Sequence, residues 1–100
     1  MVISLSGDLE CSRQAEVAQT LRRAAKRAQV VLDLSDVRYV DSSFVATMIR
    51  LRKLREAKGL PPQHIAGAHS MVTLVLDIFH LRNAWPMFDK VDDAISAFWR

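Results

Sequence analysis

Residues 30–58, VVLDLSDVRYVDSSFVATMIRLRKLREAK, decide the fold of this chain. The segment begins with a nearly continuous run of apolar, β-branched residues, which is typical of a strand covered on both faces. From Phe44 the apolar residues change to helical spacing, with Phe44, Met48, Leu51 and Leu54 along one side. The sequence therefore predicts a buried strand at residues 30–34, a short polar connection, a second short apolar segment with Val37, Tyr39 and Val40, and then a helix.

Three polar residues, Asp41, Ser42 and Ser43, stand where this strand passes into the helix. Aspartate and serine side chains commonly accept hydrogen bonds from the free N–H groups of a first helical turn. In open α/β sheets, ligand and partner sites tend to lie beyond the carboxyl ends of the strands. We therefore take this junction as the candidate functional site.

The segments before the junction repeat the alternation of strand and helix. Residues 1–5 predict a strand, Ser6-Gly7-Asp8 a turn, and residues 10–28 a helix with one apolar stripe and one basic face. The basic residues of this first helix are Arg13, Arg22, Arg23, Lys26 and Arg27, and those of the helix after the junction are Arg50, Arg52, Lys53, Arg55 and Lys58.

The segments after the junction continue the same pattern. Gly59 ends the helix, residues 64–66 predict a weak strand, and residues 71–81 predict a well-buried helix with Ser70 as its cap. A short edge strand at 84–88 and a last helix capped by Asp89 follow. The sequence thus predicts one α/β domain over residues 1–100. Its central sheet is mainly parallel or mixed, with about four strands flanked by about four helices.

Composition narrows the function classes. Half of the 100 residues are hydrophobic, a quarter are charged and the net charge is +3, which is ordinary globular composition. The basic helical faces also carry acids or glutamine and no interleaved aromatic residues, so we expect a solvated or partner-binding face rather than a nucleic-acid site. No apolar run is long enough to enter and cross a bilayer. The single cysteine, Cys11, suits a reducing cytoplasm.

No catalytic constellation is evident in the sequence. His64, His69 and His80 are too widely spaced for a local metal pair, and there is no glycine-rich phosphate loop or nucleophile elbow. We therefore predict that the protein is not an enzyme and holds no metal or cofactor of its own. An exposed Trp99 would be an anchor for a partner or for a homodimer.

The motifs around the junction resemble those of a known family. The pair VLDLSDV at 31–37 and VDSS at 40–43 resembles the signature of STAS domains, a family that includes bacterial anti-sigma factor antagonists and similar domains of sulfate transporters and lipid-transport ABC systems. LSGDLE at 5–10 resembles the family's Gly-Glu-Leu-Asp turn, and MFD at 87–89 resembles its closing strand. The resemblance covers most of the chain and implies the STAS fold.

The resemblance also implies a site. In the antagonists, the serine directly after the signature aspartate is phosphorylated by an anti-sigma factor that is also a kinase; that position is Ser42 here, and Ser43 is the less favoured acceptor. The expected partner-binding residues are Glu10, Asp33, Asp41, Ser42, Ser43 and Phe44. Phe44 departs from the family, which usually has glycine there, and it places a large ring near the expected phosphoacceptor.

Two functions follow from the resemblance. The first is a stand-alone cytoplasmic antagonist that binds an anti-sigma factor kinase and is switched off by phosphorylation at Ser42. The alternative is an accessory subunit that sits on the ATPase of a lipid-transport ABC complex. A simpler interpretation leaves Ser42 and Ser43 as helix caps, Asp33 as an acceptor for loop amides, and Glu10 as a first-turn carboxylate.

Overall fold

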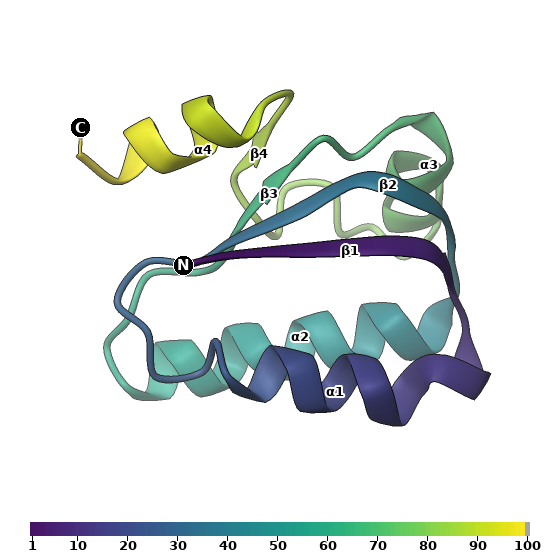
Figure 1. The fold of residues 1–100 in the computed structure, drawn as a ribbon, viewed down its shortest axis with the longest axis horizontal. Helices are drawn as coiled ribbons and strands as arrows, with labels where there is room; N and C mark the ends of the chain where they lie inside the picture. Colours follow the sequence, from purple (N-terminus) through teal and green to yellow (C-terminus); the bar gives the residue numbers. More distant parts are fainter. Residues whose placement is uncertain (100) are drawn as a thin grey trace.

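The computed structural model describes residues 1–99 and contains a four-stranded parallel sheet (Figure 1). Neighbouring strands in the sheet are also neighbours in the sequence. Their order is β1 (Val2–Leu9), β2 (Val31–Val40), β3 (His64–Ala66) and β4 (Met87–Phe88). The predicted α/β class is thereby confirmed, and the sheet is fully parallel within the described residues.

Helices cover the two faces of the sheet unequally. The connecting helices are α1 (Gln14–Arg22), α2 (Ser42–Ala57) and α3 (Ser70–Ile78), and their buried side chains share one hydrophobic cluster with β1, β2 and β3. Helix α4 (Val91–Ser96) forms a separate cluster in which Ala94 packs with Val31 and Ala66. Figure 1 shows α1 and α2 side by side on one face and α4 on the other. Right-handed crossovers between consecutively added parallel strands produce this arrangement.

Strand β2 lies at the centre of the core. Val31, Leu32, Leu34, Val37 and Val40 are all at most 2% exposed. Its apolar run is continuous at the start because Leu32 faces the α1–α2 layer while Val31 faces α4. At about 25–30 cal/mol per Å² of apolar surface, each fully buried aliphatic side chain contributes roughly 1.5–3 kcal/mol, so β2 is one of the main sources of stability.

The predicted turn at Ser6-Gly7-Asp8 is wrong, because β1 continues through it to Leu9. Gly7 has a φ of +77°, and the pairing of β1 with β2 shifts register between Ser4 and Ser6 and again between Gly7 and Asp8. A glycine with positive φ is characteristic of a bulge as well as of a turn. Here the strand bends without reversing, and it ends level with β2.

The expectation that the third helix is well buried is also wrong. In α3 only Val72 and Leu76 are buried, while Met71, Leu74, Ile78 and Phe79 at its end are exposed. The N-cap is His69 rather than Ser70, since the His69 side chain accepts the N–H of Met71 and its other ring nitrogen contacts the carbonyl of Val37. The helix ends at Ile78, three residues earlier than predicted.

Two neighbouring residues of α2 exchange their predicted environments. Leu54, expected in the core, is 45% exposed, whereas Arg55, expected on the basic outer face, is completely buried. Arg55 donates to four carbonyl oxygens, of Ala24 (2.7 Å), Arg27 (2.6 Å), Ala28 (3.1 Å) and Pro61 (2.8 Å). The guanidinium therefore joins the segment that follows α1 to the segment that follows α2, and burial lowers its pKa.

The last helix is held by packing rather than by a side-chain cap. Asp89 does not cap it; the N-cap is Lys90, with no side-chain hydrogen bond. The ring of His64 in β3 donates from Nδ1 to the carbonyl oxygen of Ala94 in α4 at 2.8 Å. The His64 ring also stacks on Phe98 of the short 3-10 helix η2 (Ala97–Trp99), with ring centroids 3.7 Å apart. None of the helices within residues 1–99 has the length and apolar character needed to cross a membrane.

Candidate functional site

The ends of β1 and β2 bring the candidate site together. The N–H of Asp41 donates to the carbonyl oxygen of Leu9 at 3.1 Å, so the two strands finish side by side. Glu10 and Asp41, the residues that follow the two strands, therefore stand at the same edge of the sheet. The serine pair begins α2 at this edge.

Asp41 is the N-cap of α2. Its Oδ1 accepts the N–H of Ser43 at 2.9 Å, the N–H of Phe44 at 3.2 Å and the hydroxyl of Ser43 at 2.6 Å. Burial alone would raise the pKa of this carboxyl group, but the bonds from Ser43 and Phe44 and from the N–H of Cys11 outweigh burial and lower the pKa. Asp41 is therefore a carboxylate at neutral pH and organises the first turn of the helix.

The two serines have different environments. The hydroxyl of Ser43 is half-buried and bonded to Asp41, and its carbonyl accepts the Thr47 hydroxyl at 2.9 Å. Ser42 is the first residue of α2 and is exposed, and its hydroxyl makes no hydrogen bond within residues 1–99. Of the two hydroxyls, only that of Ser42 is both accessible and uncommitted to the helix cap.

Phe44 does not cover the serine. Its side chain is 3% exposed and belongs to the main hydrophobic cluster with Leu9 and Val17. The large ring that the sequence places beside the expected phosphoacceptor is thus directed into the core, where it anchors the first turn of α2. Beside this buried ring, Ser42 is exposed and Asp41 and Ser43 are partly exposed.

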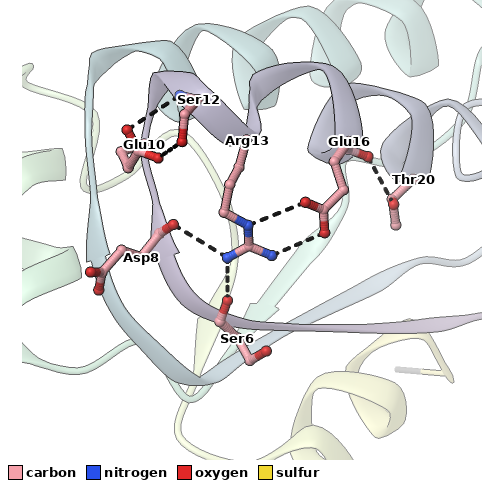
Figure 2. Close-up of polar contacts among 7 residues, drawn as sticks. All are labelled: Ser6, Asp8, Glu10, Ser12, Arg13, Glu16 and Thr20. Atoms are coloured by element: carbon pink, nitrogen blue, oxygen red, sulfur yellow. Dashed lines mark hydrogen bonds and ion pairs between the residues drawn. The ribbon is translucent and has the colours of Figure 1, made fainter.

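Glu10 caps the 3-10 helix η1 (Cys11–Arg13) in the same way that Asp41 caps α2. It accepts the N–H of Ser12 at 3.2 Å and also its hydroxyl (Figure 2). These bonds from Ser12, the hydroxyl first, lower the pKa of Glu10, while the nearby charge of Asp41 acts in the opposite direction. The carboxylates of Glu10 and Asp41 are thus near enough to interact, and Glu10 lines a small pocket together with Ser43 and Phe44.

Arg13 is a residue of the site whose role the sequence did not indicate. Figure 2 shows its guanidinium between the bulge of β1 and the start of α1. It donates to the carbonyl oxygens of Ser6 (2.6 Å) and Asp8 (3.2 Å) and pairs with Glu16 at 3.1 Å. The spacing of Arg13 and Glu16 is a recognisable helix pair. The bulge carbonyls become visible only when β1 is paired with β2.

Asp33 stands apart from the other predicted site residues. It lies near the start of β2, level with Ser4 of β1 and Ala66 of β3, and its Oδ1 accepts the N–H and hydroxyl of Ser35 at 3.0 and 2.7 Å. Asp33 and Asp41 are eight positions apart along β2 and its end, roughly 26 Å at about 3.3 Å per residue. The structure thus brings together Glu10, Asp41, Ser42, Ser43 and Phe44, but not Asp33.

The assembled site combines a helix N-terminus with two carboxylates. The helix start offers N–H groups and the positive end of a dipole, which favour an added anion. The carboxylates of Glu10 and Asp41 make the same surface negative. Within residues 1–99, no group of three histidine, cysteine, aspartate or glutamate side chains is placed to hold a metal ion.

Comparisons with known proteins identify the family and the fold. A family model described as "Mlab, STAS domain" matches residues 1–83. The fold is similar to that of an anti-sigma-factor antagonist (STAS) domain protein from Planctomyces limnophilus, with a TM-score of 0.89 and 23% identity over 99% of this chain and 90% of that chain.

Two further solved structures share the fold. One is the cell fate determinant SpoIIAA of Bacillus in its phosphorylated form, with a TM-score of 0.73 and 18% identity over 97% of this chain and 88% of that one. The other is the STAS domain of a SulP transporter from Vibrio cholerae, with a TM-score of 0.72 and 21% identity over 98% and 79% of the two chains. With its signature residues at the strand–helix junction and a family match over 83 of its 100 residues, the chain belongs to the STAS domain family.

Proposed function

We propose that this chain is a protein-binding regulator that docks on a partner through the start of α2, and that phosphorylation of Ser42 prevents docking. The observation that carries the proposal is the exposed Ser42 hydroxyl, which makes no hydrogen bond within the described residues. The neighbouring Asp41 already accepts the N–H groups of Ser43 and Phe44, so the Ser42 hydroxyl is not needed for capping. The partner we propose is an anti-sigma factor with serine kinase activity. The phosphorylated form of the structurally similar SpoIIAA supports this choice.

The proposed switch acts through charge. A phosphoserine adds roughly 1.5 to 2 negative charges. In the free protein the helix N-terminus accommodates them, while in a complex they would be pressed between the partner and the carboxylates of Glu10 and Asp41. Juxtaposed like charges at an interface cost several kcal/mol, and about 1.4 kcal/mol is a tenfold change in affinity. Docking is thus lost while the domain stays folded.

The kinase step transfers a phosphoryl group from the partner's ATP to the Ser42 oxygen. The bond from the γ-phosphorus to the β-bridging oxygen breaks, the new phosphate ester forms, and the serine proton leaves to a base on the partner. Nothing in this chain needs to bind the nucleotide. The chain supplies an accessible acceptor on a rigid helix start, since Asp41 and Phe44 hold the flanking backbone.

The test combines transfer and binding. With the purified kinase and labelled ATP, Ser42→Ala should abolish incorporation into the chain and Ser43→Ala should preserve it. In titration calorimetry, Ser42→Asp should bind the kinase at least about tenfold more weakly than Ser42→Ala. The matched control is Ser70→Asp, which places the same charge on the exposed first residue of α3. Equal binding by the two Ser42 variants would reject the switch.

A second candidate is an accessory subunit on the ATPase of a lipid-transport ABC complex. The family model's description as "Mlab, STAS domain" and the transporter STAS domain with the same fold favour it. This candidate predicts that the chain co-purifies stably with an ATPase and a permease and that Ser42 receives no phosphate. Because the ATPase would dock on the same start of α2, Ser42→Asp should still disrupt the complex. Phosphate transfer in the kinase assay would instead favour the first candidate.

A further inference from the structure

The charges of this chain are divided between the two sides of the sheet. Residues 13–27 and 42–58, which form the α1–α2 layer, carry nine basic and two acidic side chains besides the buried Arg55, a net charge of +7. The segment 89–100, which includes α4, carries three acidic and two basic residues, a net charge of −1. Figure 1 shows the α1–α2 layer and α4 on opposite faces of the sheet. The molecule therefore has one basic face and one acidic end on the opposite layer.

An apolar groove runs between α1 and α2 on the basic face. Buried Leu21 and Leu51 form its floor, and its cavity measures about 140 Å³, which is room for an apolar side chain. Arg22 and Arg50 line it together with Leu54, whose side chain is 45% exposed although it lies on a helix of the core layer. The groove thus offers apolar surface between two cations.

A ridge of the opposite character lies on α4 and η2. Asp92, Ile95 and Trp99 follow one another at steps of three and four, so they share one side of the helical segment. Ile95 is 37% exposed and Trp99 is 74% exposed. Asp92 and Asp93 are exposed beside them. We call Asp92, Asp93, Ile95 and Trp99 the acidic ridge.

We propose that the acidic ridge of one copy of this chain docks in the α1–α2 groove of a second copy. The aspartates would approach Arg22 and Arg50, and Ile95 or Trp99 would pack against Leu54 and the groove floor. The groove is basic and the ridge carries aspartates, and such charge complementarity fixes register and specificity in protein interfaces. Since groove and ridge lie on opposite layers, the contact is head-to-tail.

The groove suits a protein segment better than other anionic partners. Its floor is recessed between two helices, and Leu54 is the one exposed apolar side chain among its lining residues, whereas amphipathic membrane helices present a broad apolar face. The residues that line it include no aromatic side chain on which a nucleic-acid base would stack. An acidic ridge with a protruding apolar side chain is the complementary shape, and α4 carries one.

The experiment uses the full chain and follows its mass by sedimentation velocity. At about 0.1 M salt the weight-average mass should rise with protein concentration, and it should fall towards the monomer at about 1 M, because exposed charges are screened. A groove variant, Leu54→Asp, and a ridge variant, Trp99→Asp, should each be monomeric. Both substitutions are at exposed positions, so their far-UV circular dichroism should match that of the wild type.

Mixing the two variants tests the geometry directly. The groove variant keeps an intact ridge and the ridge variant keeps an intact groove, so an equimolar mixture should form heterodimers that grow no further. Phe79→Asp, which places the same charge on the exposed end of α3, is the control and should associate like the wild type.

Three results would overturn the proposal: a wild-type chain that stays monomeric at about 0.1 M salt, a mixture that shows no heterodimer, or association that Phe79→Asp abolishes while Leu54→Asp leaves it intact. Cosedimentation of a monomeric wild type with phosphatidylglycerol vesicles, lost in the groove variant, would assign the basic face to a membrane instead. None of these results depends on Ser42 phosphorylation.

Discussion

The guanidinium of Arg55 lies 2.7 Å from the carbonyl oxygen of Ala24, although the two residues are 31 positions apart in the chain. This bond and three others to backbone carbonyls replace the water that a buried cation has lost. The carbonyls of Ala24, Arg27 and Ala28 lie just beyond the end of α1, where the helix dipole is negative. The cation is therefore held by oriented dipoles, without a carboxylate.

Replacing Arg55 should destabilise the domain strongly. Arg55→Met leaves buried carbonyls without donors, and we expect a loss of about 3 kcal/mol in the free energy of unfolding. Urea denaturation at neutral pH would measure it. Arg52→Met, one turn away on the exposed side of α2, is the control and should change stability by no more than about 0.5 kcal/mol. Equal losses in the two variants would contradict the role assigned to the carbonyl contacts.

The cap formed by Asp41 should make stability dependent on pH. The native carboxyl has a lowered pKa, so its contribution is complete above the unfolded-state pKa of about 3.9 and is lost as the pH falls through the lower native value. Asp41→Asn, which can still cap, should lose less stability than the wild type between about pH 5 and pH 2. Asp41→Ala should lose about 1 kcal/mol already at neutral pH. A wild type and an Asn variant with identical acid profiles would rule out this source of pH dependence.

Charge at Ser42 should leave the fold intact. A carboxylate on the first residue of α2 interacts favourably with the helix dipole and unfavourably with Asp41, so we expect Ser42→Asp to change the free energy of unfolding by less than about 0.5 kcal/mol. Ser43→Ala should cost about 1 kcal/mol, because it removes the 2.6 Å hydrogen bond to Asp41. Thermal melting of both variants would show whether any loss of partner binding by Ser42→Asp is merely unfolding.

Gly67 should be far less tolerant of a side chain than Gly59. Both have positive φ, +72° and +69°, which costs a residue with a Cβ about 1–2 kcal/mol. A Cβ at Gly67 would also stand 2.8 Å from the Cβ of Ser35 and 3.1 Å from its backbone, whereas Gly59 has open space. Gly67→Ala should therefore lower the melting temperature clearly more than Gly59→Ala does. Similar melting temperatures would show that the β2–Gly67 contact can relax.

The sequence predicts the central strand and the serine-led helix well because their signals are local. The apolar run of β2 and the Asp-Ser-Ser cap depend on the residues themselves and their immediate neighbours. The same holds for Gly59, which has a positive φ and lies directly after the C-cap of α2. These features place Ser42 at the helix start before any tertiary contact is considered.

Features that depend on distant partners are the ones the sequence does not predict. Helical spacing from Phe44, Met48 and Leu51 fits residue 54 and residue 55 about equally, and leucine is the expected choice for a core. What decides in favour of Arg55 is a set of carbonyls contributed by residues 24–28, which no local pattern reveals. Likewise, α3 is apolar on several sides, so its composition does not show which side packs against the sheet and which side is exposed to solvent.

The strand order has a consequence for synthesis on the ribosome. Each new strand pairs with the one made just before it, so every strand finds its neighbour already in place as the chain emerges. The helix that covers the other face of the sheet is made last, when Ala94 of α4 packs against Val31 and Ala66. Until that late segment has been made, the nascent domain has an uncovered apolar strip along its middle strands, and completing α4 is the step that closes it.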